Sequence, residues 1–169
     1  MPFTPFHLGP AILAGILLLR HLNLPALIVA SAVLDLEPLL VIVTDANYPL
    51  HGFFHTFLGG TLVALALSFV MCRFSGCTAR IVRAFGISQT PSPRTVAAAS
   101  FLGVYSHLLL DSPLYADMEP FFPIALNPLF SPQLSGVIYA SCAVAFFLGV
   151  AAYAARLLLP KQLQSRAGG

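Results

Sequence analysis

Charged side chains are scarce in this sequence. Asp, Glu, Lys and Arg together make up 8% of the 169 residues, whereas hydrophobic residues make up 58%. A soluble globular domain is about 25% charged, so this chain has too few charges to cover a surface that faces water. The composition therefore excludes an ordinary soluble domain and predicts a polytopic membrane protein.

Cysteine is also rare, and a basic N-terminal region is missing. The three cysteines, Cys72, Cys77 and Cys142, form no CxxC pair. Cys72 and Cys142 lie in apolar runs, so we interpret them as packing residues. The first nineteen residues contain no Lys or Arg. A cleavable signal peptide begins with such basic residues, so we expect none here.

Proline and glycine divide the apolar sequence into five segments. This pattern predicts an all-α membrane bundle of about five helices, which forms a single domain over residues 1–169 with a metal site near the outer membrane face. The segments are residues 7–20, 24–44, 51–72, 95–111 and 133–159. A span takes about 20 residues. The third and fifth segments are long enough, whereas the first and fourth are expected to be tilted or buried in the bundle.

Basic residues are absent from the loops on one side of this five-segment arrangement. With five spans, all Lys and Arg fall on one side: Arg20, Arg73, Arg80, Arg83, Arg94, Arg156, Lys161 and Arg166. Positive charge marks the cytoplasmic side of an inner or plasma membrane. The loop 73–94, expected to be solvated, and the tail 160–169 are therefore predicted to be cytoplasmic. The N-terminus and the loops 45–50 and 112–132 then face outward, and the loop 112–132 is either a lid or a rigid outer loop.

The few titratable side chains gather on the predicted outer side. In the stretch LHGFFHT, His51 and His55 are four residues apart, which places them on one face at the start of the third helix. In HLLLD, His107 and Asp111 have the same spacing at the outer end of the fourth helix. His7 begins the first helix at the same level. We therefore expect these five side chains to lie close together.

Asp35 and Glu37 add two carboxylates to the second segment. Residues i and i+2 of a regular helix point about 200° apart. Pro38 removes a backbone hydrogen bond and restricts the preceding residue. We expect a break over residues 34–38 that would let both carboxylates face one cavity. Irregular backbone at membrane depth is tolerated where it lines an enclosed or wet site.

A buried cluster of this kind is costly and a bound cation can compensate for it, although a single membrane histidine is more often a packing residue. One carboxylate in the bilayer interior costs about 2.5–3.5 kcal/mol. Because all Lys and Arg lie on the other side, a divalent metal is the expected counter-charge. Imidazole and carboxylate ligands favour zinc, or else manganese or iron. One or two ions are expected, and the candidate ligands are His7, Asp35, Glu37, His51, His55, His107 and Asp111.

Several known catalytic and binding motifs are missing. The HxxxH pair lacks the glutamate of HExxH, which excludes a zincin protease, and no GxSxG nucleophile turn is present. No basic stripe with interleaved aromatic residues is present, so we expect no nucleic-acid partner. His21 lies beside Arg20 in a predicted cytoplasmic turn and is therefore not a candidate ligand.

Four short blocks resemble those of the YdjM-like family of membrane-bound metal-dependent hydrolases. They occur in the family order and span residues 5–130: PFHLGPA with His7, LDLEP with Asp35 and Glu37, HGFFHT ending at His55, and GVYSHLLLDSP with His107 and Asp111. Two positions depart from the family pattern. His51 directly precedes Gly52, where the family often has Arg between its first His and the Gly, and Glu37 replaces the commoner Asp. The resemblance implies metal binding more firmly than turnover.

Three functions are compatible with these observations. The favoured one is a metal-dependent hydrolase that cleaves an ester or phosphoester of a lipid or lipid-linked substrate by means of a metal-activated water. Asp35 or Glu37 would be a further ligand or the general base. A second alternative is a metal-ion or proton-coupled transport or sensing protein, although no inverted repeat is evident. The third is a structural protein in which a closed metal site staples the helices. Membrane lipids are the expected partners in every case.

Overall fold

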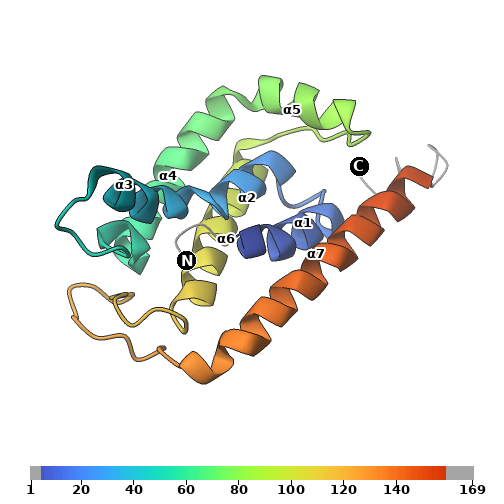
Figure 1. The fold of residues 1–169 in the computed structure, drawn as a ribbon. Coiled ribbons are helices and arrows are strands. Elements are labelled where there is room, and N and C mark those ends of the chain that lie inside the picture. Colours follow the sequence, from blue (N-terminus) through green and yellow to red (C-terminus); the bar gives the residue numbers. More distant parts are fainter. Residues whose placement is uncertain (1–4, 159–169) are drawn as a thin grey trace.

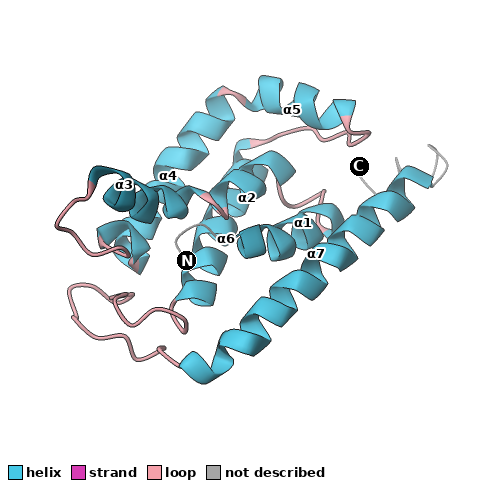
Figure 2. Ribbon diagram, in the orientation of Figure 1, coloured by secondary structure: helices cyan, strands magenta, loops and turns pink. Residues whose placement is uncertain are grey.

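The computed structural model describes residues 5–158 of the chain; residues 1–4 and 159–169, which include the predicted tail 160–169, lie outside the described part. The described residues form helices and loops without a strand (Figure 2). The predicted all-α fold is therefore confirmed. The α-helices are α1 (Leu8–Leu17), α2 (Leu24–Ala30), α3 (Leu36–Thr44), α4 (Phe57–Arg73), α5 (Ser75–Ala84), α6 (Pro93–Asp111) and α7 (Ser135–Leu158). Short 3-10 turns cover Pro5–His7, Val33–Asp35, Phe53–His55 and Pro132–Leu134.

The expected number of about five helices is not confirmed. The second segment is divided into α2 and α3, and an additional helix, α5, follows the third segment. The loop 73–94, which we expected to be a solvated loop, contains this helix. The axes of α4 and α5 differ in direction by 75°. The first, fourth and fifth segments correspond to α1, α6 and α7.

The second segment breaks about one turn earlier than its proline suggests. Asn23 caps α2, because its side-chain oxygen accepts a hydrogen bond of 3.1 Å from the Ala26 N–H. The helix ends at Ala30, and the chain passes through a 3-10 turn at Val33–Asp35 before α3 begins. Pro38 is the third residue of α3, where a missing N–H costs no intrahelical hydrogen bond. The break lies between Ala30 and Leu36, so it overlaps the predicted range 34–38 only in part.

The third segment becomes helical only after both of its histidines. Thr56 is the N-cap of α4, and its hydroxyl accepts a hydrogen bond of 2.9 Å from the Gly59 N–H. His51 lies in the preceding loop and His55 ends a 3-10 turn. The prediction that these histidines share a helix face is therefore wrong. Their rings are nevertheless close, with centroids 4.9 Å apart.

Helices α2, α4 and α6 pack together, and α1 packs against both α2 and α7 (Figure 1). The contact between α4 and α6 buries Ala64, Val104 and Leu108. Gly103 of α6 approaches α2 so closely that a Cβ atom there would collide with Ala30 and the Leu27 carbonyl. This close approach brings His107, one turn later on α6, to the C-terminal end of α2.

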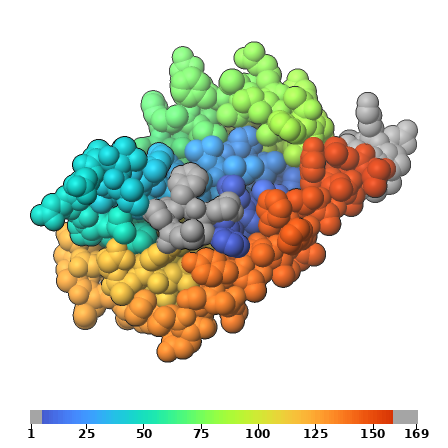
Figure 3. All heavy atoms as spheres, in the orientation of Figure 1, coloured from blue at the N-terminus to red at the C-terminus, as the bar shows by residue number. Residues whose placement is uncertain are grey.

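Two helical stretches are long and apolar enough to cross a membrane, Leu24–Thr44 and Pro132–Leu158. Helices α4 and α5 provide a third if the bent pair is one span. The structure thus supports two to three spans, fewer than the five expected segments. Helix α7 forms one edge of the molecule (Figure 3) and exposes Val137, Phe147 and Leu158 by 63%, 71% and 85%. Such an apolar face is suited to contact with lipid.

Candidate metal centre

Five buried side chains meet at one end of α4 and α6. His7 ends the 3-10 turn before α1, and His55 ends the turn before α4. His107 and Asp111 lie on the last turns of α6, whereas His51 lies in the loop that leads to His55. The exposed fraction of each of these residues is 5% or less. The predicted convergence of the five residues is therefore present in the fold.

These residues form two groups of three that share Asp111. The first group is His7, His107 and Asp111, and the second is His51, His55 and Asp111. Within each group, one potential ligand atom of every residue lies within 4.8 Å of the others. Imidazole nitrogens and carboxylate oxygens are common ligands of first-row divalent metals. The cluster can therefore hold a metal ion.

The first group places two imidazoles on one carboxylate. His7 Nε2 lies 3.0 Å from Asp111 Oδ1, and His107 Nε2 lies 3.1 Å from Asp111 Oδ2. The two rings are stacked, with centroids 4.0 Å apart. His107 donates a hydrogen bond of 2.8 Å from Nδ1–H to the Ser31 carbonyl. Because a carbonyl only accepts, the Nε2 atom of a neutral His107 presents a lone pair to the carboxylate.

In the second group, His55 is held at Nδ1 in the same way as His107. Its Nδ1–H donates a hydrogen bond of 2.7 Å to Oε2 of Glu37. Its Nε2 is buried and has no hydrogen-bond partner among residues 5–158. An unpartnered polar atom in a buried site is costly, and native proteins satisfy nearly all of them. A cation at Nε2 would remove this cost.

Three of the four histidines are oriented in the same way, by an acceptor at Nδ1. The pairs are His51 with the Asp117 carboxylate, His55 with the Glu37 carboxylate, and His107 with the Ser31 carbonyl. Histidines that bind metals usually donate their other ring N–H to such a group, which fixes the tautomer and the ring orientation. All three rings are thus prepared to use Nε2 as a ligand atom.

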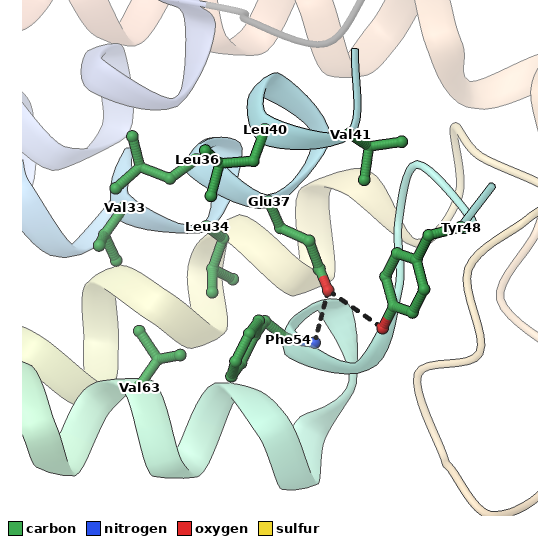
Figure 4. A pocket seen from close by; sticks show the side chains of 9 residues that line it. All are labelled: Val33, Leu34, Leu36, Glu37, Leu40, Val41, Tyr48, Phe54 and Val63. Carbon is green, nitrogen blue, oxygen red and sulfur yellow. Dashed lines mark hydrogen bonds between the residues drawn. The ribbon is translucent and has the colours of Figure 1, made fainter. Parts of the chain in front are cut away.

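Asp35 and Glu37 surround the two groups without belonging to either. Asp35 is buried, and its Oδ1 lies 3.8 Å from His107 Nε2, which is beyond hydrogen-bond distance. Glu37 contacts the centre only through His55. Its Oε1 accepts a hydrogen bond of 3.2 Å from the Phe54 N–H and lies 3.5 Å from the Tyr48 hydroxyl (Figure 4). Glu37 therefore positions an imidazole, and Asp35 lies nearer to the potential ligand atoms.

Asp117 is a functional candidate that the sequence reasoning missed. Its carboxylate accepts hydrogen bonds from Nδ1–H of His51 (3.0 Å) and from the His51 backbone N–H (3.2 Å). Burial raises the pKa of Asp117, but the hydrogen bonds from His51 outweigh it and hold this pKa below its usual range. The signal in the sequence was weak, because an acidic residue in an outer loop has no fixed spacing from a histidine 66 residues earlier.

The loop 112–132 packs over this side of the centre. The Phe57 N–H donates a hydrogen bond of 2.8 Å to the Pro120 carbonyl, which joins the loop to the start of α4. The rings of Phe53 and Phe122 meet edge to face, with centroids 5.7 Å apart. The loop therefore holds Asp117 in place against His51.

No protein family, curated protein or solved structure matches this chain. The resemblance to the YdjM-like family therefore stays a hypothesis that rests on the four sequence blocks.

Proposed function

We propose that this chain is a membrane-embedded, metal-dependent hydrolase that cleaves an ester or phosphoester of a lipid or lipid-linked molecule. One observation carries the proposal. Buried imidazoles whose Nδ1 atoms are held by acceptors direct Nε2 lone pairs into a site that contains the Asp111 carboxylate. Lone pairs and negative charge converge there, which favours a bound cation.

The proposed ligands are the members of the two groups. Asp111 belongs to both groups, which favours two ions that share its carboxylate over a single ion. Zinc is the preferred metal, and the same ligands would also bind manganese or iron. Such an ion lowers the pKa of a bound water toward about 7.

Asp35 is the proposed general base. Its carboxylate lies 3.8 Å from His107 Nε2 and outside both ligand groups, so a water at the centre would be within its reach. Glu37 is engaged by His55 at 2.7 Å and would act by orienting that ring. This division refines the expectation that either carboxylate could serve as the base.

The centre is proposed to lie on the outer side of the membrane. The histidines and Asp111 gather where α4 begins and α6 ends, whereas Arg73 and Arg94 lie at the opposite ends of these two helices. Positive charge marks the cytoplasmic side, so the opposite end faces outward in an inner or plasma membrane.

The test is elemental analysis of the protein purified in detergent. The wild type is expected to contain one or two equivalents of zinc, manganese or iron. His55→Ala and His107→Ala should each lose most of this metal, whereas His21→Ala, at an exposed histidine outside the centre, should keep it. Wild-type protein that is folded, free of metal and unable to bind added metal would exclude the hydrolase.

A structural metal site is the second candidate, because the ligating side chains are almost completely buried. Asp35→Asn separates the two functions. For a hydrolase, this variant keeps its metal and loses turnover in a screen of esters and phosphoesters. For a structural site, no substrate is turned over by the wild type, and removal of the metal by a chelator lowers the melting temperature.

A further inference from the structure

Two different pockets lie near the second group. The first is an apolar groove of about 310 Å³ between the 3-10 turn Val33–Asp35, α3 and α4. Its walls include Leu34, Leu40, Val63 and Glu37 (Figure 4), and Glu37 also contacts His55 of the centre. The second is a cleft of about 240 Å³ in the outer loops, and His51 forms part of its wall. Glu37 in the wall of the groove contacts His55, and His51 in the wall of the cleft belongs to the same group as His55, so each pocket reaches a residue tied to this group.

The ring of Tyr48 belongs to both pockets. It is fixed there because its hydroxyl accepts a hydrogen bond of 2.8 Å from the Phe53 N–H. A molecule with an apolar part and a polar part would therefore find both sites next to each other. Sites for small molecules measure about 300–1,000 Å³, and the two pockets together reach this range.

The cleft is built to attract a cation. Three aromatic rings line it, those of Tyr48, Phe53 and Phe122, together with the carboxylates of Asp117 and Glu119. Asp117 is occupied by His51, whereas Glu119 is half-buried in the wall of the cleft. No Lys or Arg lines either pocket. Aromatic faces combined with carboxylates are the usual binding site for an ammonium group.

Resting on the proposed hydrolase function, we propose that the substrate is a zwitterionic phospholipid with an amine-bearing headgroup. Its ammonium group binds in the cleft beside Glu119, and one acyl chain lies in the groove beside Leu40 and Val63. The phosphate and ester linkages between these two parts then lie over the His51–His55–Asp111 group. This placement also explains how a phospholipid binds on a face without Lys or Arg, because the cleft recognises the positive part of the headgroup.

The chain contains no tryptophan, which allows a single introduced reporter. In Phe122→Trp, the fluorescence of the only tryptophan reports occupancy of the cleft, and indole is a good partner for a cation. Dihexanoyl phosphocholine and dihexanoyl phosphoglycerol are titrated into this full-length variant in a neutral detergent. The two lipids share their chains and differ in the charge of the headgroup. Val137→Trp, on the exposed face of α7, is the matched control for partitioning into the micelle.

The expected result is a saturable fluorescence change with the phosphocholine lipid, which the phosphoglycerol lipid does not reproduce. Adding Glu119→Gln or Phe53→Leu should weaken this binding by about 3- to 30-fold. Adding Val63→Phe should weaken it by filling the groove, while the Val137→Trp control responds alike to both lipids. Equal responses of Phe122→Trp to the two lipids, or no saturable response, would overturn the inference.

Failure of this inference and failure of the proposed function are distinguishable. Binding and turnover are measured separately, so headgroup-selective binding to a protein that hydrolyses no ester would support the lipid site and exclude the hydrolase. Metal-dependent hydrolysis without headgroup selectivity would leave the hydrolase in place and exclude this substrate class.

Discussion

Single residues behind the ligands are expected to control the affinity of the centre. His51, His55 and His107 are each held at Nδ1 by an acceptor that is itself outside the two ligand groups. Loss of such an acceptor leaves the ligand in the sequence but frees its ring to rotate or change tautomer. The contribution of these acceptors is therefore measurable without deleting a ligand.

The first prediction concerns Glu37. In Glu37→Gln the neutral amide accepts a weaker hydrogen bond from His55, so the ring is less firmly held and its Nε2 is less basic. We expect the affinity for zinc to fall by about 10- to 100-fold, measured by competition with a chelator of known affinity. Glu119→Gln, which removes a carboxylate that contacts no histidine, is the matched control and should bind zinc like the wild type. Equal affinity in the two variants would contradict the orienting role.

The second prediction concerns pH and Asp117. Partial burial raises the pKa of Asp117, but the hydrogen bonds from His51 hold it below the usual value of about 3.9. The pKa of Asp117 is lower in the folded state than in the unfolded state. At a pH between these two values the unfolded state binds more protons, so the free energy of unfolding falls as the pH falls through this window. The melting temperature of the metal-free protein should decrease below about pH 4, and Asp117→Asn should flatten this decrease. Asp45→Asn, at an exposed carboxyl outside the centre, should retain the decrease of the parent.

At the scale of helices, the sequence predicts the elements with local signals best. Ser92 and Thr95 form a capping box at the start of α6, so the predicted range 95–111 lies within two residues of the observed helix, and His107 and Asp111 share a face as expected. The start of α4 is missed because the N-cap at Thr56 lies inside the apolar run. Partners such as the Ser31 carbonyl and Asp117 are missed because they are 66 or more residues away from their histidines. Contacts of this range leave no periodic pattern in one sequence.

The third prediction tests the packing of α6 on α2. A Cβ atom at Gly103 would collide with Ala30 and the Leu27 carbonyl. Gly103→Ala should therefore push α6 away from α2, weaken the hydrogen bond from His107 to the Ser31 carbonyl, and lower the stability by about 1–3 kcal/mol. It should also weaken zinc binding, measured with the same chelator competition.

A glycine in open space provides the control for this substitution. At Gly136 of α7, no atom lies within 4 Å of the position that a Cβ atom would take, so Gly136→Ala should change stability by no more than about 0.5 kcal/mol. If Gly103→Ala behaves like Gly136→Ala in both stability and zinc binding, the close approach does not position His107.

At the scale of the whole molecule, the distribution of charge divides the protein into two ends. The titratable cluster lies where α4 begins and α6 ends, and Arg73, Arg80 and Arg83 lie at the end of α4 and on α5. Helix α5 leaves α4 at 75° and carries both basic and apolar side chains. A helix of this kind is suited to lie along the membrane surface. Helix α5 would then lie along the cytoplasmic surface of the membrane.

The last prediction tests this orientation through Cys77. Cys77 lies on α5 and is exposed, whereas Cys72 is partly buried and Cys142 is buried. A membrane-impermeant maleimide should label Cys77 in inside-out vesicles and not in right-side-out vesicles. In a Cys77→Ser background, Ala116→Cys, at an exposed position of the loop 112–132, should show the opposite pattern. Labelling of Cys77 from the outer side would show that the protein has the opposite orientation. The metal centre would then lie at the cytoplasmic face, and its substrates would be restricted to the inner leaflet.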